Sequence, residues 1–310
     1  MNLERRSFLK LSTAALTVGP ALGAADGPMP MSMLGKTGMK VSRFCLGGYH
    51  IANKSDENGV RLVHRAIELG VNFFDSAQGY HKGRSDQIYG MALGGSSQRQ
   101  KVYLMSKAIA RDRDKAMSQL EDTLRWMKTD YLDLWQCHMV STQEEMDRIY
   151  GPNGALEAFV AAKRQGKVRH IGFSGHRDPE LLVRFIQACD EWEVAQFPLN
   201  VVDPHYLSFL EIFLPAARKK GLGVITIKPN AFGNITGKGI ASIEECLRFV
   251  LSQDVDAVVS GVDTLEHLEQ NIAIVKRHQP MTADEQRTLL ARTKKGPFGV
   301  EIEDYKKKPA

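Results

Sequence analysis

The sequence lacks the features that mark several classes of protein. No apolar run reaches the roughly 18 residues that a membrane-spanning helix needs. Its four cysteines form no Cys-x-x-Cys pair and share no metal-ligand spacing with histidines. No metal site is therefore predicted. We expect Cys45 and Cys137, which lie in apolar runs, to be buried free thiols.

Basic residues also form no stripe interleaved with aromatic residues. The formal net charge is +5, and much of the excess lies near the two ends of the chain, at Arg5, Arg6 and Lys10 and at positions 306–308. Because a nucleic-acid-binding face gathers its cations on one surface, no nucleic-acid partner is expected.

The composition is that of an ordinary globular protein. Of the 310 residues, 43% are hydrophobic and 25% are charged, which is enough apolar material for a large core. The length of the chain alone would suggest two domains. An α/β barrel of about 250 residues nevertheless folds as one.

The first 25 residues have the order of parts of an export signal. Residues 4–10 read Glu-Arg-Arg-Ser-Phe-Leu-Lys, a mild apolar stretch covers 11–23, and small residues follow at 23–25. This order resembles the twin-arginine signal, with Glu4 where Ser or Thr is usual. The resemblance implies a cleaved peptide over 1–25, the twin-arginine translocase as partner, no stable membrane span after cleavage and a periplasmic or other extracytoplasmic location. The alternative is the basic N-terminus of a cytosolic enzyme.

After a predicted β-hairpin at 31–42, strand and helix patterns alternate along the chain. The predicted strands cover 44–47, 71–75, 102–106, 131–137, 168–173, 194–197, 224–227 and 257–260. The predicted helices cover 59–69, 86–93, 115–127, 154–165, 179–189, 207–220, 243–251 and 265–275. A long loop is expected at 140–153, and a further helix at 283–292 before a Lys-rich end.

These patterns predict a (β/α)8 TIM barrel over 31–280, with a C-terminal helix and Lys-rich tail over 281–310. The strands are apolar throughout, as expected when helices cover both faces of a parallel sheet, and eight units suggest closure. An open, doubly wound sheet is the alternative. It is less favoured because no Gly-x-Gly-x-x-Gly follows the first strand.

Polar side chains end three successive predicted strands. They are Asp75, Lys107 and His138, and Tyr80 lies in the loop after Asp75. Active sites of such barrels lie at these strand ends. Each residue alone is weak evidence, since a strand-end Asp is usually a helix cap or ion-pair partner. The four together are much less expected by chance.

The four residues form a chemically sensible set. A tyrosine hydroxyl has a pKa near 10, and a nearby lysine cation would lower it. Asp75 would keep Lys107 charged and in place, while His138 could hydrogen-bond a substrate carbonyl as Tyr80 donates its proton. No nucleophile or metal is supplied, which leaves reduction by an external hydride donor.

This arrangement resembles the aldo/keto reductase superfamily. The most specific matches are residues 72–77 with Tyr80, and the segment 166–174 that enters and leaves the fifth strand. The resemblance covers nearly the whole mature chain. It implies reduction of a small carbonyl substrate with NADP or NAD, and a hairpin that plugs the barrel. Segments 172–176 and 227–229 look like a bacterial branch that carries ferredoxin-type domains, whose cluster cysteines are absent here.

The resemblance also implies residues for the cofactor. Ser174 and Gln196 match those that hold the nicotinamide amide, but Gly175 stands where Asn is usual. Lys228 stands near the position of the usual stacking tyrosine, and Asn271 matches the residue that binds adenine.

The segment that binds the 2′-phosphate in NADPH-specific relatives is different here. It offers Gly261 and Asp263 in place of Lys, Ser or Arg, and His267 where an Arg often lies. An acidic residue would repel the phosphate and could accept a hydrogen bond from a ribose hydroxyl. A relaxed or NADH-leaning specificity is predicted.

The substrate pocket is expected in the loops after the strands, near Tyr49, His50, Met139 and His176. The alternative for the segment after 174 is a helix entrance, with Asp178 as N-cap and Pro179 in the first turn. Two other functions remain open: a nucleotide-binding sensor or subunit of this fold with little turnover, and an unrelated barrel isomerase or hydrolase of the cell envelope.

Overall fold

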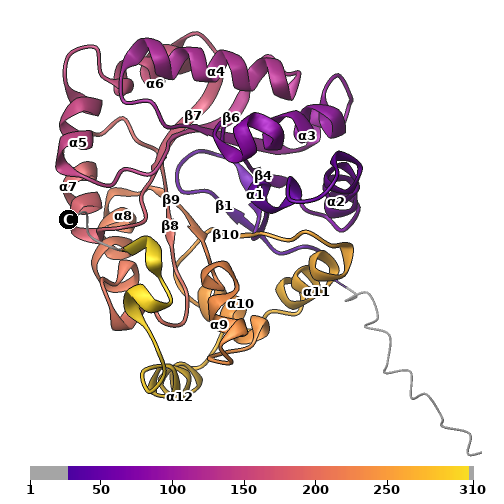
Figure 1. Ribbon diagram of the computed structural model, residues 1–310, viewed down its shortest axis with the longest axis vertical. Coiled ribbons are helices and arrows are strands. Elements are labelled where there is room, and N and C mark those ends of the chain that lie inside the picture. The colour runs from indigo at the N-terminus through magenta and orange to yellow at the C-terminus, as the bar shows by residue number, and fades with distance from the viewer. Residues whose placement is uncertain (1–26, 307–310) are drawn as a thin grey trace, which may run out of the picture.

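Eight parallel strands close into a barrel in the computed structural model, which describes residues 27–306. Figure 1 shows the strands in the middle of the molecule, with the helices around them. The predicted TIM barrel is confirmed. The predicted export signal lies outside the described residues. The barrel strands are β3 (Phe44–Gly47), β4 (Phe73–Asp75), β5 (Tyr103–Ala108), β6 (Leu132–Cys137), β7 (Val168–Ser174), β8 (Val194–Pro198), β9 (Gly223–Ile227) and β10 (Ala257–Ser260).

At least one helix follows each strand and covers the barrel from outside. No helix within 27–306 is both long and apolar enough to cross a bilayer. The α-helices are α1 (Gly48–Ile51), α2 (Asp56–Glu68), α3 (Arg84–Leu93), α4 (Arg113–Met127), α5 (Gln143–Tyr150), α6 (Ala155–Arg164), α7 (Pro179–Gln187), α8 (Leu214–Lys220), α9 (Asn234–Gly237), α10 (Ile243–Leu251), α11 (Leu265–Lys276) and α12 (Ala283–Thr293).

The predicted hairpin closes the amino end of the barrel. β1 (Met31–Met33) pairs antiparallel with β2 (Lys40–Ser42). Leu34, in the turn, is fully buried and packs with interior side chains of the strands. Gly35, with φ +51°, lies so close to the start of β9 that a Cβ there would come within 2.3 Å of the Gly223 nitrogen. Only glycine suits this contact. Because the hairpin covers the amino end of the barrel, the carboxyl end is left for the site.

Two connections differ from the prediction. The expected loop at 140–153 contains α5, which Thr142 caps by accepting from the backbone N–H of Glu145. The helix expected at 207–220 begins as a π-helix over Phe209–Phe213 before α8. A physical reason for the irregular start is Pro215, which has no N–H to donate to the preceding turn.

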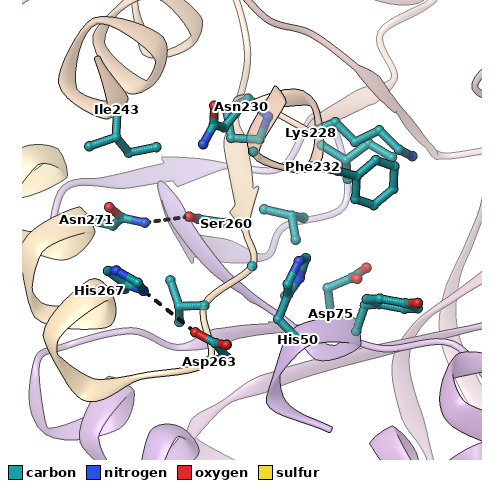
Figure 2. Close-up of a pocket in the computed structure, with 18 of the residues that line it drawn as sticks. His50, Asp75, Lys228, Asn230, Phe232, Ile243, Ser260, Asp263, His267 and Asn271 are labelled. Atoms are coloured by element: carbon teal, nitrogen blue, oxygen red, sulfur yellow. Dashed lines mark hydrogen bonds and ion pairs between the residues drawn. The ribbon is translucent and has the colours of Figure 1, made fainter. Parts of the chain in front are cut away.

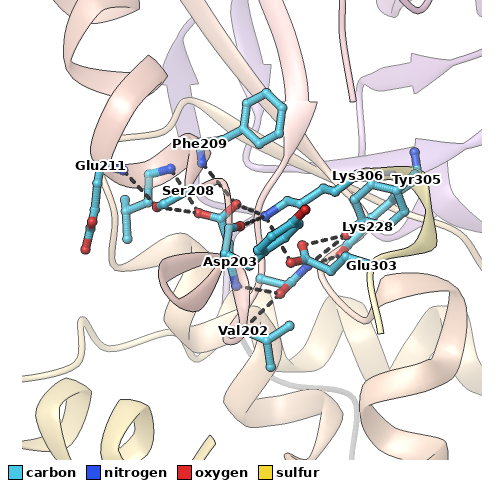
Figure 3. A network of polar contacts seen from close by, with 12 residues as sticks. Val202, Asp203, Ser208, Phe209, Glu211, Lys228, Glu303, Tyr305 and Lys306 are labelled. Atoms are coloured by element: carbon cyan, nitrogen blue, oxygen red, sulfur yellow. Dashed lines mark hydrogen bonds and ion pairs between the residues drawn. The ribbon is translucent and has the colours of Figure 1, made fainter. Parts of the chain in front are cut away.

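The described part of the predicted C-terminal region, residues 281–306, is folded. The predicted helix is present as α12, but residues 299–306 turn back and pack against the barrel. Lys306 is fully buried, and its ammonium group lies 2.7 Å from Asp203 Oδ1 and 2.9 Å from Glu303 Oε2. Figure 3 shows this buried cluster beside Tyr305 and Lys228. The segment 299–306, which we call the C-terminal strap, thereby joins the wall of the cavity described below.

Candidate active site

A cavity of about 900 Å3 opens at the carboxyl end of the barrel. Seven of the predicted site residues line it, and Figure 2 labels several of them. They are Asp75, Tyr80, His138, Lys228, Gly261, Asp263 and Asn271. The other three, Lys107, Ser174 and Gln196, are not in the lining and are buried. No group of three or more metal-ligating side chains occurs within residues 27–306.

A buried ion pair lies at the floor of this cavity, where Asp75 lines the cavity and Lys107 lies beneath the lining. Lys107 is 2% exposed, and its ammonium group donates to Asp75 Oδ1 and, over 2.7 Å, to the carbonyl oxygen of Ser76. Gln196 Nε2 donates to the same Asp75 oxygen over 3.1 Å. Burial acts to lower the pKa of Lys107, but Asp75 and Tyr80 together outweigh it, and the pKa lies above its ordinary value. Lys107 is therefore a fixed cation at neutral pH.

Tyr80 lies above this pair, at the start of a 3₁₀ turn that follows β4. Its ring centroid is 5.1 Å from Lys107 Nζ and 5.7 Å from the His138 ring. Burial raises the pKa of Tyr80 to about 12, although the Lys107 charge acts in the opposite direction. Lys107 thus acts in the predicted direction, but desolvation of the phenolate, which the sequence does not reveal, has the larger effect on the pKa. The hydroxyl remains protonated at neutral pH.

His138 follows β6 and faces Tyr80 across the cavity floor. Its backbone N–H donates to Ala108 over 2.8 Å, but its ring Nε2 is buried without a partner among the described residues. Burial lowers the pKa of His138 well below its usual range, and the charges of Lys107 and Lys228 lower it further. A neutral imidazole with one unpaired nitrogen can form a hydrogen bond with a ligand oxygen.

The two residues predicted to hold a nicotinamide amide lie behind this floor. Ser174 is fully buried, and its hydroxyl accepts from the backbone N–H of Met139 over 2.9 Å. Gln196 Oε1 is buried without a hydrogen-bond partner among residues 27–306. At Gly175, an added Cβ would come within 2.5 Å of the Leu182 side chain. A larger residue there would require Leu182 to move.

The other end of the cavity is built from β10 and α11. Asn271 Nδ2 donates to Ser260 Oγ over 3.0 Å. Asp263 is bordered by Lys54 at 3.8 Å and His267 at 3.6 Å. In Figure 2, His50 stands between Asp263 and Asp75.

The His50 ring covers Gly261. A Cβ at position 261 would lie 2.0 Å from His50 Nδ1. A glycine therefore keeps this wall flat enough for both the imidazole and a ligand.

Several lining residues were not predicted. Asp304 and Tyr305 reach the cavity from the C-terminal strap, which the sequence indicated only as a charged tail.

The predicted N-cap Asp178 is confirmed, since it accepts from the backbone N–H groups of Glu180 and Leu181. His176, two residues earlier, nevertheless lines the cavity. The helix entrance and the site therefore share one loop.

Comparison with known proteins is consistent with this geometry. The model of the aldo/keto reductase family matches residues 43–245. The uncharacterized oxidoreductase YrpG of Bacillus subtilis is 32% identical over 239 residues, which are 69% of this chain and 70% of that protein. The L-galactose dehydrogenase of Arabidopsis thaliana is 24% identical over 294 residues, 82% of this chain and 90% of that one. The holo form of the aldo-keto reductase AKR11C1 from Bacillus halodurans has a TM-score of 0.74 at 21% identity, covering 90% of this chain and 100% of that one.

Proposed function

Because the chain belongs to the aldo/keto reductase family, we propose that it reduces an aldehyde or ketone to an alcohol, with Tyr80 as the proton donor. The observation that carries the proposal is the buried Asp75–Lys107 pair beneath Tyr80, with the unpaired His138 nitrogen beside it. These groups can polarise a carbonyl and protonate its oxygen.

In this mechanism, His138 orients the carbonyl oxygen and Tyr80 donates a proton to it. Lys107 offsets the negative charge that develops on the Tyr80 oxygen, since an ammonium group 5.1 Å from the ring favours the phenolate. Asp75 keeps Lys107 protonated and fixed in place. The Tyr80 donor is thus neutral, and Lys107 beneath it is cationic. This arrangement suits a reaction that leaves a tyrosinate, which must then be reprotonated.

The residues present fit a nicotinamide cofactor, NADP or NAD. When bound, it supplies the hydride. Gln196 Oε1, which has no hydrogen-bond partner among the described residues, would accept from the carboxamide group. Asn271 and Gly261 line the far end of the same cavity, where the adenosine half would be held.

The same cavity end suggests which nucleotide is preferred. Asp263 is only partly balanced by Lys54 at 3.8 Å, and no arginine lines this part of the cavity within the described residues. A 2′-phosphate would meet a carboxylate there, so we expect NADH to be accepted at least as well as NADPH. Melting curves with each nucleotide test this expectation, and stabilisation by NADPH alone would contradict it.

The activity is tested by following nucleotide oxidation with small aldehydes, together with L-galactose oxidation because one relative is an L-galactose dehydrogenase. The variant Tyr80→Phe removes only the hydroxyl and is expected to lower kcat/KM by about 10²- to 10⁴-fold. Tyr103→Phe, at the start of β5 on the opposite end of the barrel, is the matched control. Tight nucleotide binding without turnover in the native chain would instead indicate the sensor function.

We further propose that residues 1–25 direct the folded protein to the twin-arginine translocase and that it acts outside the cytoplasm. This route accepts folded proteins, so an enzyme could carry its nucleotide with it. Fusion of these residues to a reporter, with Arg5 and Arg6 both replaced by Lys as a control, tests the proposal. Export that survives the double replacement would contradict it.

A further inference from the structure

Lys228 is a lysine whose ammonium group lies inside the cavity rather than on the surface. It follows β9, and its Nζ is 3.3 Å from His176 Nδ1, to which it can donate a hydrogen bond. The same atom lies 5.0 Å from the centroid of the Phe232 ring and 4.8 Å from that of Tyr305. Two ring faces and one neutral imidazole therefore surround it.

No carboxylate lies within ion-pair distance of Lys228 among residues 27–306. The fully buried lysines are different: Lys107 pairs with Asp75, and Lys306 pairs with Asp203 and Glu303. A cation taken out of water is costly unless an anion accompanies it. Lys228 is partly buried at the cavity wall, and it lacks the carboxylate partner that the two fully buried lysines have.

The carboxylates nearest to Lys228 do not serve as its ion-pair partner. Glu303 is already engaged by Lys306, Asn200 and Tyr305. Asp75 is paired with Lys107, and Asp304 lines the cavity but lies beyond 4 Å. The pKa of Lys228 is lowered to about 7, chiefly by burial and then by the charge of Lys107, while Asp75, Asp304 and Glu303 act in the opposite direction. An additional anion would restore the charge of this lysine.

The backbone holds Lys228 in this position at a cost. Its φ of +57° is in the left-handed region, and Ala231 and Phe232 in the same loop share that region. The Lys228 carbonyl accepts from the Ala231 N–H over 3.0 Å. Left-handed backbone at non-glycine residues persists where the surrounding structure enforces it, commonly at ligand sites.

We propose that Lys228 binds an anionic group, a carboxylate or a phosphate, carried by the carbonyl substrate. This inference rests on the proposed reductase function and assigns its substrate class. The anionic group lies a short spacer away from the carbonyl, because the His176 ring that contacts Lys228 is 6.3 Å from the His138 ring. His176 and the two aromatic rings would seat the body of the substrate.

The other anion available to this cavity is the diphosphate of the nucleotide. The geometry favours the substrate, since Lys228 contacts the loop of His176 beside His138, whereas Asp263 and Asn271 lie at the other end of the cavity (Figure 2). The experiment distinguishes the two sources.

The test compares substrates that differ only in charge. Rates are measured for 3- and 4-carboxybenzaldehyde and for their methyl esters, with native protein, Lys228→Met, Lys228→Arg and the control Lys101→Met. Lys101 is an exposed lysine in the turn before β5, at the opposite end of the barrel. Native protein and Lys101→Met are expected to prefer at least one acid over its ester by about tenfold or more in kcat/KM. Lys228→Met is expected to lose that preference.

Comparison of lysine with arginine at position 228 provides a pH readout. In native protein, the KM for the preferred acid should rise between pH 6 and pH 9 as Lys228 loses its proton. In Lys228→Arg, the acid preference should persist across this range because guanidinium stays charged. Met, Arg and Lys all have the same left-handed backbone cost, so the variants are expected to fold alike.

An acid-to-ester ratio that is the same in native protein and Lys228→Met would overturn the inference. If nucleotide binding is also weaker in Lys228→Met, that unchanged ratio would assign Lys228 to the diphosphate of the nucleotide. If no aldehyde is reduced with either nucleotide, the proposed reductase function fails by itself. Calorimetric binding of terephthalate against dimethyl terephthalate, in native protein and Lys228→Met, then decides whether Lys228 is an anion site.

Discussion

Replacing Lys306 by Met should remove the cation that holds the C-terminal strap against the barrel. Lys306, Asp203 and Glu303 are all fully buried, so the change leaves two carboxylates enclosed without their counterion. Removal of one partner from a buried ion pair costs about 3–5 kcal/mol. Asp203 keeps hydrogen bonds from Ser208 and two backbone N–H groups. The lower end of that range, about 3 kcal/mol, is therefore expected.

Chemical unfolding at 25 °C measures this loss, and a thermal scan should show a Tm lower by about 5 °C, since the unfolding entropy grows with chain length. The matched control is Lys238→Met, because Lys238 pairs with Glu301 of the same strap at the surface, with side chains 43% and 61% exposed. An exposed pair contributes at most about 1 kcal/mol. A Lys306→Met protein no less stable than Lys238→Met would refute the role given to this cluster.

The stability deficit should also depend on pH. Burial raises the pKa of Glu303 in the folded protein, and loss of Lys306 should raise it further. A carboxyl group with a raised folded-state pKa binds more protons when folded, so stability falls as pH rises. The deficit of Lys306→Met should shrink between pH 8 and pH 5, and a deficit that grows on acidification would contradict the assignment.

Three further changes test the rest of the site. Asp75→Asn leaves Lys107 buried without a carboxylate, so kcat/KM should fall by at least about tenfold. Because Lys107 would then lose its proton more easily, the rate should decline at a lower pH than in native protein. An unaltered pH–rate profile would count against the role of the Asp75–Lys107 pair. Gly261→Ala places a Cβ 2.0 Å from His50 Nδ1; nucleotide titration should show a Kd weakened by about tenfold, and addition of His50→Ala should recover part of the loss. Asp263→Ser removes a charge near the proposed ribose site, so the NADPH-to-NADH ratio of kcat/KM should rise, and a ratio that falls would be opposite to our account.

The barrel could be predicted from the sequence because its signal is local. Each strand is a short apolar run, and each helix has its own period and ending residue. Asp75, Lys107 and His138 could be grouped because parallel strands in a barrel present their carboxyl ends at one edge. Tyr80 followed from its distance of five residues from Asp75.

The C-terminal strap and the state of Tyr80 could not be predicted in the same way. Lys306 meets Asp203 across 103 positions of sequence, and no local pattern indicates that a lysine in a run of lysines is buried. The pKa of Tyr80 depends on a balance between burial and one nearby cation. The residue types give the sign of the charge effect but not the degree of burial.

The same limit applies to Lys228. Resemblance placed it near the nicotinamide, but its ammonium group contacts His176 and rings from two different segments. This arrangement depends on a left-handed backbone and on the strap, neither of which the sequence displays.

The most direct test of the central claim is transfer of isotope. Purified protein would be incubated with an aldehyde and NADH or NADPH deuterated at the transferable C4 position, and the alcohol would be examined by mass spectrometry. The account predicts an alcohol that carries one deuterium on its carbinol carbon in native protein, and a rate lower by at least about a hundredfold in Tyr80→Phe. Alcohol without deuterium, or native-like turnover in Tyr80→Phe, would contradict it.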